Sequence, residues 1–220
     1  SGSSGTLAAG DYLKDKLDAK IAVVEALECP TLLYNGYGEH NIQGIGDKHV
    51  PLIHNVMNTD FVVGVSDQAT NNLNLIFNTA VGQNYLNKKH SFEIDFIKRL
   101  PEFGFSTIAN ILASIKLAKY MKLGSDDAII TVATDGADLY LSELNKTKQD
   151  FKGIFDEVSC AEIFGQYLKG LKTDHTLELN QKDKERIFNL GYYTWVEQQG
   201  INLNDFEKRR DQNFWNEHYQ

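Results

Sequence analysis

A run of serine, glycine and threonine opens the sequence, Ser1-Gly2-Ser3-Ser4-Gly5-Thr6, and leads directly into a helical pattern. The first N–H groups of a helix have no partner within the helix, and its dipole favours an anion at that end. Gly2, Ser3, Ser4, Gly5 and Thr6 therefore predict a loop that binds phosphate. The same residues also occur in purification-tag remnants, but the loop runs into the helix without a break, which favours a phosphate site.

Two further segments have the composition of a binding site. Gly44-Ile45-Gly46 lies in a long polar loop, rich in glycine, that covers residues 34–51, and ordered loops of that length are usually functional. Thr134-Asp135-Gly136 follows an apolar, β-branched run, so it is expected at the end of a strand. The plainer interpretation of Asp135-Gly136 is a tight turn, which this dipeptide often forms.

Histidine and cysteine spacing predicts no metal site. His40, His49 and His54 flank the loop around Gly44 and are candidates for contact with a substrate, but their spacing matches no metal-binding pattern. Cys29 and Cys160 are too few for a disulfide framework. A reducing, cytoplasmic location is expected.

Composition narrows the class of partner. The 220 residues include 30 acidic and 22 basic side chains, with a net charge of -8, which disfavours binding to nucleic acid or to an anionic membrane. No apolar run approaches the roughly 20 residues that span a bilayer. A small-molecule substrate is the better expectation. The sequence lacks an initiating Met, so we expect the natural polypeptide to extend upstream.

The periodicity of apolar residues predicts alternating helices and strands. Strands are expected at 21–25, 61–65 and 128–133, and helices at 6–19, from about 68, at 92–100 and at 107–123. Ser66 is expected to cap the helix that follows it. This order indicates an α/β fold, a three-layer sandwich with a mostly parallel sheet. Residues 1–140 would form the α/β domain, and residues 141–220 a helical extension without a convincing strand.

Several segments, in the same order, resemble the cysteine synthase-like (fold-type II) superfamily of pyridoxal-phosphate enzymes. The opening loop with Lys20–Glu25 is similar to that family's phosphate-loop unit, and Ile42–Gly46 is similar to its glycine-rich loop near the cofactor. The other similar segments are Asp60–Asp67, Phe105–Ala109 and Ile129–Tyr140. The resemblance covers residues 2–140 and identifies the chain with the C-terminal portion of such an enzyme, lacking its upstream part.

The resemblance implies pyridoxal 5'-phosphate as cofactor, a small amino acid as substrate, and β-elimination or β-replacement, hence a lyase or transferase. It places the cofactor at the opening loop, at Gly44–Gly46 and at Thr134–Gly136. In most members a hydroxyl after an aspartate binds the ring nitrogen, whereas here Gly136 follows Asp135. Thr134, a water molecule or Asp135 itself remain as alternatives.

The family's Schiff-base lysine lies upstream of the phosphate loop, so the resemblance places it outside this chain. Lys14, Lys16, Lys20 and Lys48 have no matching context and are expected to be solvated surface residues. Activity would then require the N-terminal portion of the same enzyme or a partner subunit, in an assembly expected to be a homodimer. The alternative function is a non-catalytic module that binds phosphate or a nucleotide.

Overall fold

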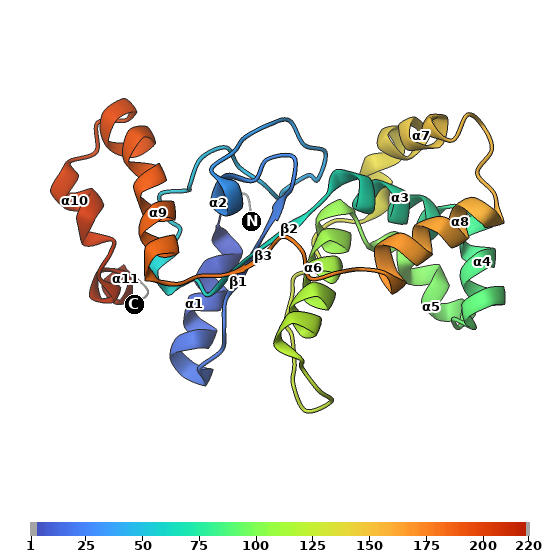
Figure 1. Ribbon diagram of the computed structural model, residues 1–220, viewed down its shortest axis with the longest axis horizontal. Coiled ribbons are helices and arrows are strands. Elements are labelled where there is room, and N and C mark those ends of the chain that lie inside the picture. The colour runs from blue at the N-terminus through green and yellow to red at the C-terminus, as the bar shows by residue number, and fades with distance from the viewer. Residues whose placement is uncertain (1–3, 219–220) are drawn as a thin grey trace. The chain divides into compact units, whose positions relative to one another are not determined.

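The computed structural model describes residues 4–218. Its contacts divide the chain into two compact units, which we treat separately (Figure 1). The sheet unit comprises Ser1–His40, Gly44–Gly64 and His175–Gln220, and the helical unit comprises Asn41–Gln43 and Val65–Asp174. The predicted division into residues 1–140 and 141–220 stays a prediction.

The sheet unit contains a small mixed sheet with strand order β1-β2-β3. Strands β1 (Ala22–Ala26) and β2 (Phe61–Val65) match the first two predicted strands. Strand β3 (Thr176–Glu178) pairs antiparallel with β2, with Val62 opposite Leu177. No strand was predicted after residue 140, so that prediction is wrong. A three-residue strand carries almost no periodic signal of its own, and its pairing partner defines it.

The helices of the sheet unit precede β1, lie between β1 and β2, or follow β3. They are α1 (Gly5–Leu17), α2 (Thr31–Tyr34), η1 (Val56–Asn58), α9 (Gln181–Tyr192), the π-helical η5 (Tyr193–Gln198), α10 (Leu203–Lys208) and α11 (Gln212–His218). One apolar cluster joins these helices to the sheet, and its buried members include Leu7, Val23, Val62, Ile187 and Phe206. Helix α1 confirms the helix predicted at 6–19.

The helical unit is built around α6 (Phe105–Met121) and α3 (Asp67–Asn78). Helix α6 confirms the helix predicted at 107–123, and Ile108 and Leu112 on it are buried as the spacing requires. Ser66 caps α3 by accepting a hydrogen bond from the Ala69 N–H, at 3.2 Å, as predicted. The remaining elements are α4 (Ala80–His90), α5 (Ile94–Arg99), η2 (Leu100–Glu102), η3 (Ala137–Tyr140), α7 (Leu141–Asp150), α8 (Glu157–Phe164) and the π-helical η4 (Gly165–Lys169).

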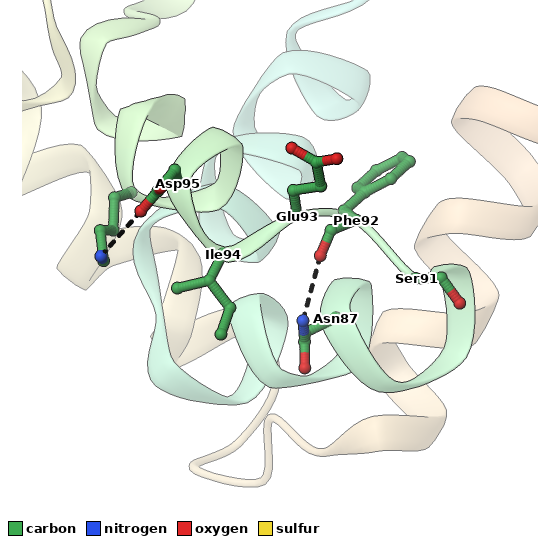
Figure 2. Close-up of a pocket in the computed structure, with 7 residues that line it drawn as sticks. Asn87, Ser91, Phe92, Glu93, Ile94 and Asp95 are labelled. Carbon is green, nitrogen blue, oxygen red and sulfur yellow. Dashed lines mark hydrogen bonds and ion pairs between the residues drawn. The ribbon is translucent and has the colours of Figure 1, made fainter.

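A hollow lies at the turn between α4 and α5 (Figure 2). The Asn87 amide donates to the Phe92 carbonyl at 3.0 Å, and Lys98 pairs with Asp95 at 3.0 Å. The hollow contains none of the predicted site residues. Because these polar groups are already paired with one another, we assign it no function.

The segment at 128–133 differs from its prediction. It was expected to be a buried strand, but it has no regular secondary structure, and Ile130 is 76% exposed. The side chain of Asn110 donates to the Val132 carbonyl at 3.0 Å. The strand prediction is wrong for this chain, because a strand needs neighbours for its backbone hydrogen bonds and no described strand pairs with residues 128–133.

No described helix combines the length and hydropathy needed to cross a membrane. Within residues 4–218, no group of three or more His, Cys, Asp or Glu side chains is arranged to hold a metal ion.

Candidate functional site

The start of α1 has the form expected of an anion site. Ser4 precedes the helix in a left-handed conformation, with φ 62° and ψ 5°, and its side chain is buried. Gly5 and Thr6 form the exposed first turn, and a Cβ added to Gly5 would meet no atom within 4 Å. Gly5 and Thr6 thus lie exposed at the end of this 13-residue helix where an anion is favoured, while the Leu7 N–H donates to the Ser4 carbonyl at 3.0 Å. Gly2 and Ser3 lie outside the described residues.

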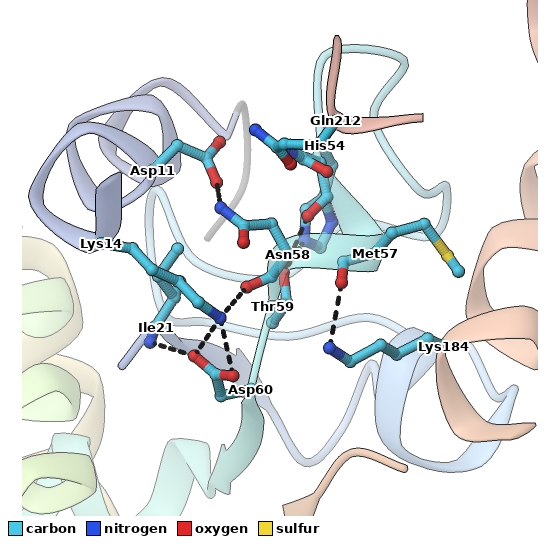
Figure 3. A network of polar contacts seen from close by, with 11 residues as sticks. Asp11, Lys14, Ile21, His54, Met57, Asn58, Thr59, Asp60, Lys184 and Gln212 are labelled. Carbon is cyan, nitrogen blue, oxygen red and sulfur yellow. Dashed lines mark hydrogen bonds and ion pairs between the residues drawn. The ribbon is translucent and has the colours of Figure 1, made fainter. Parts of the chain in front are cut away.

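A polar network holds α1 against the sheet (Figure 3). Lys14 Nζ donates to both carboxylate oxygens of Asp60, at 2.7 and 2.8 Å, and to the Asn58 carbonyl at 2.8 Å. Asp60 also accepts from the Ile21 N–H at 2.8 Å, and Asp11 accepts from the Asn58 amide. Lys14 is therefore part-buried and paired, which corrects the expectation of a solvated lysine. These contacts fix the orientation of α1.

The loop at Gly44-Ile45-Gly46 is ordered by its neighbours. Gly44 and Gly46 have φ of 77° and 94°, which favours glycine, and Ile45 is buried between them. A Cβ on Gly46 would lie 2.8 Å from His40 Nε2, so a larger residue there would have to displace that ring. Thr31 holds the next part of the loop by donating to the Asp47 carbonyl. The loop therefore has one defined conformation next to an imidazole.

A buried acidic side chain holds α2, the helix that carries Thr31. Glu25, on β1, accepts hydrogen bonds from the Leu32 and Leu33 N–H groups, at 3.0 and 2.8 Å, and so caps α2. Burial raises the pKa of Glu25, and the two N–H bonds partly oppose that shift. Glu25 was predicted only as a strand residue. A single acidic residue in an apolar strand was the available signal for its capping role.

Thr134, Asp135 and Gly136 belong to the helical unit. The Thr134 hydroxyl shares a 2.6 Å hydrogen bond with the Ser106 hydroxyl, and the Thr134 N–H donates to Thr107 Oγ1 at 3.2 Å. Asp135 accepts from the Tyr140 hydroxyl, and its carbonyl accepts from the Gly104 N–H at 2.8 Å. The turn is therefore tied to the start of α6.

Hydrogen bonding controls the protonation of this turn. The bonds from Tyr140 and Thr134 lower the pKa of Asp135. Burial, with the neighbouring carboxylate, raises the pKa of Tyr140 to about 12. Asp135 is thus a carboxylate and Tyr140 a neutral phenol at pH 7. The turn can present a negative charge to a ligand.

The sheet unit contains two of the predicted groups, Ser4–Thr6 and Gly44–Gly46, and the helical unit contains the third, Thr134–Gly136. The roles predicted for these glycines and hydroxyls in binding a cofactor stay predictions. The assignment of these residues to one cofactor site stays a prediction.

The three flanking histidines have different environments. His49 is exposed, with Nδ1 3.3 Å from the Thr194 hydroxyl, and His40 packs on Gly46. His54 is 3% exposed, and its Nε2 lies 2.9 Å from the Thr59 hydroxyl. Burial is the main reason that the pKa of His54 falls to about 3. His54 is therefore a neutral core residue.

This burial predicts a pH dependence of stability. The unfolded chain binds a proton at His54 below pH about 6.5, whereas the folded chain does not until about pH 3, so stability falls as the pH falls through this window. We expect His54 to contribute a loss of about 2 kcal/mol between pH 6.5 and 5. Urea unfolding of His54→Gln should show a shallower pH dependence than wild type.

Replacing the exposed His218 by Gln is the matched control, and its pH dependence should equal that of wild type. Glu25 acts in the opposite sense, because its raised pKa stabilises the fold at low pH and that contribution is lost as the pH rises. Since Glu25 is present in every variant, the difference between wild type and His54→Gln isolates His54. If the free energy of unfolding depends on pH in His54→Gln as it does in wild type, His54 is not the buried neutral histidine that causes this dependence.

Lys116, on α6, is a buried lysine that the sequence prediction missed. It is 3% exposed and its Nζ lies 3.4 Å from Asp174 Oδ1. Burial lowers its pKa, and Asp174 partly restores it. The helical periodicity around Lys116 was clear, but that pattern does not show whether the lysine ammonium is buried or reaches solvent.

Comparison with known proteins supports the resemblance. The chain is 34% identical to cysteine synthase B of Campylobacter jejuni over 143 residues, which make up 64% of this chain. The chain covers 40% of the length of that relative. No protein-family profile matches the chain. These findings support a cysteine synthase-like relationship for a partial chain.

Proposed function

We propose that this chain is the C-terminal part of a pyridoxal-phosphate-dependent enzyme that acts on an amino acid by β-elimination or β-replacement. The observation that carries the proposal is the 34% identity to cysteine synthase B over 143 residues. That alignment covers less than half of the relative, so the reaction of the complete protein is inferred from a part.

The residues of the sheet unit fit the cofactor's phosphate. The start of α1 supplies backbone N–H groups, the Thr6 side chain is exposed beside them, and Gly5 leaves open space for an oxyanion. Gly44 and Gly46 expose backbone at a loop that a Cβ would distort. We assign Ser4–Thr6, with Gly2 and Ser3, to the phosphate, and Gly44–Gly46 to the ring or substrate.

At the ring nitrogen we favour Asp135 among the three alternatives. The Thr134 hydroxyl is already engaged by the Ser106 hydroxyl and by Asp135, whose pKa it lowers. The lowered pKa of Asp135 keeps its carboxylate ionised, and an anion favours the protonated form of a nearby ring nitrogen. When bound, the cofactor supplies an electron sink. The role of Asp135 is to strengthen that sink, and Tyr140 orients the carboxylate by donating to it.

The proposal requires a lysine from outside residues 1–220. Lys14 is engaged by Asp60, and Lys16 pairs with its neighbour Asp15 on the surface. We propose that the N-terminal portion of the same enzyme or a partner subunit supplies the lysine. We further propose that the complete enzyme is a cytoplasmic homodimer whose fold is a three-layer α/β sandwich. In it, residues 1–140 belong to the cofactor domain and residues 141–220 form a helical extension.

An absorbance titration tests this function. The protein carrying its upstream portion is mixed with pyridoxal phosphate, and we expect a new visible absorption band, because the cofactor's ring is conjugated with the lysine it binds. The 220-residue chain alone should bind the cofactor without that band. If the longer protein gives no band but still binds phosphate compounds, the enzyme proposal fails and the non-catalytic phosphate-binding alternative holds.

A further inference from the structure

Arg209, at the end of α10, lies in an aromatic cage within the sheet unit. It is 5% exposed. Its guanidinium carbon lies 5.0 Å from the ring centre of Phe206, 5.4 Å from that of Phe188 and 5.9 Å from that of Trp215. Aromatic faces attract a cation, but they supply no hydrogen-bond acceptor of the strength of a carboxylate.

Two of the three guanidinium nitrogens lack a hydrogen-bond partner among the described residues. Within residues 4–218, Arg209 Nε and Nη1 are buried and have no hydrogen-bond partner. Burial lowers the pKa of Arg209 to about 10, so the side chain remains charged at pH 7. Its neighbour Arg210 shows the contrast, because it pairs with the carboxylates of Glu185 and Glu207. A buried charge without a counter-charge calls for a ligand.

Asn55 supplies a buried hydrogen-bond acceptor in the same unit. Asn55 Oδ1 has no partner within the described chain, while its amide nitrogen donates to Gln212 Oε1 at 3.0 Å. Gln212 follows Arg209 by three residues. The adjacent His54 senses the positive charge of Arg209, which lowers the pKa of His54 as a smaller cause beside burial. Arg209 and Asn55 therefore each carry an unpaired buried polar group in the same unit, and Gln212 and His54 link the surroundings of the two residues.

We propose that Arg209 and Asn55 form a binding site for a small carboxylate that carries its own hydrogen-bond donor, such as a hydroxycarboxylate. The carboxylate accepts from the guanidinium nitrogens, and the hydroxyl donates to Asn55 Oδ1. The aromatic rings exclude water and hold the guanidinium in place. This site is independent of the proposed cofactor site, since it uses none of the residues assigned there.

Thermal unfolding of the 220-residue chain with sodium lactate, propionate or chloride at equal ionic strength tests the site. We expect lactate to raise the Tm progressively, by on the order of 5–10 °C near 100 times its Kd, and propionate to raise it less, because propionate lacks the hydroxyl. Arg209→Met should abolish the lactate effect. Arg210→Met is the matched control and should keep it.

A second measurement needs no variant, in case Arg209→Met does not fold. In wild-type protein with ¹⁵N-labelled arginine, the buried Arg209 Nε–H resonance should shift saturably as lactate is added. A Tm that responds equally to lactate and chloride, or an Arg209 resonance that does not move, overturns the proposal. A stronger response to propionate than to lactate overturns the role of Asn55.

Discussion

Replacing Gly5 with Asp should weaken the binding of pyridoxal phosphate roughly 1,000-fold, on the basis that two like charges near 4 Å repel by about 4 kcal/mol at an effective dielectric of 20. The Gly5 position has open space for a side chain, so the substitution adds a carboxylate without a clash. Isothermal titration of the 220-residue chain measures the change. Pyridoxal, which lacks the phosphate, should bind wild type and Gly5→Asp alike.

The matched control is Gly165→Asp. Gly165 is also helical, and a Cβ added there also meets no atom within 4 Å, but it lies in the helical unit outside the predicted site. We expect its affinity for pyridoxal phosphate to equal that of wild type. Equal affinities in Gly5→Asp and Gly165→Asp would remove the start of α1 from the phosphate site.

Residues 128–133 should become protected from hydrogen exchange when the upstream portion is present. The segment has the apolar, β-branched composition of a buried strand, yet Ile130 and Val132 are exposed in this chain. If upstream strands complete the sheet, the amides of the segment gain partners. We expect exchange to slow by on the order of 1,000-fold, as for amides in the stable core of a domain.

Hydrogen exchange with mass spectrometry compares the 220-residue chain with the longer protein. Residues 61–65 serve as the internal control, because β2 is buried and paired in this chain already and should be protected in both. If the amides of residues 128–133 exchange as rapidly in the longer protein as in the 220-residue chain, upstream strands do not pair with this segment.

The sequence predicted those elements whose signals are local. Helix α6 has a complete apolar face, β2 is an uninterrupted buried run, and Ser66 is a favoured capping residue, so neighbouring residues alone determine these features. The glycine-rich composition around residues 44 and 46 was visible in the sequence, whereas the positive φ values that favour glycine there come from the structure.

Features set by distant partners could not be predicted. Strand β3 exists through its pairing with β2, and residues 128–133 lack a described partner despite a strong strand pattern. The burial of Lys116 and Arg209 is equally non-local, because it depends on residues such as Asp174 and Phe188 packing against them. Periodicity shows which face of an element turns inward, not which charged group is covered there.

The central claim is that this chain holds the cofactor while a lysine outside it makes the covalent bond, and reductive labelling tests this most directly. The longer protein is incubated with pyridoxal phosphate, reduced with borohydride and mapped by peptide mass spectrometry. We predict one labelled lysine, upstream of residue 1, with Lys14 and Lys116 unlabelled. A label on any lysine within residues 1–220, or no label at all, contradicts the account.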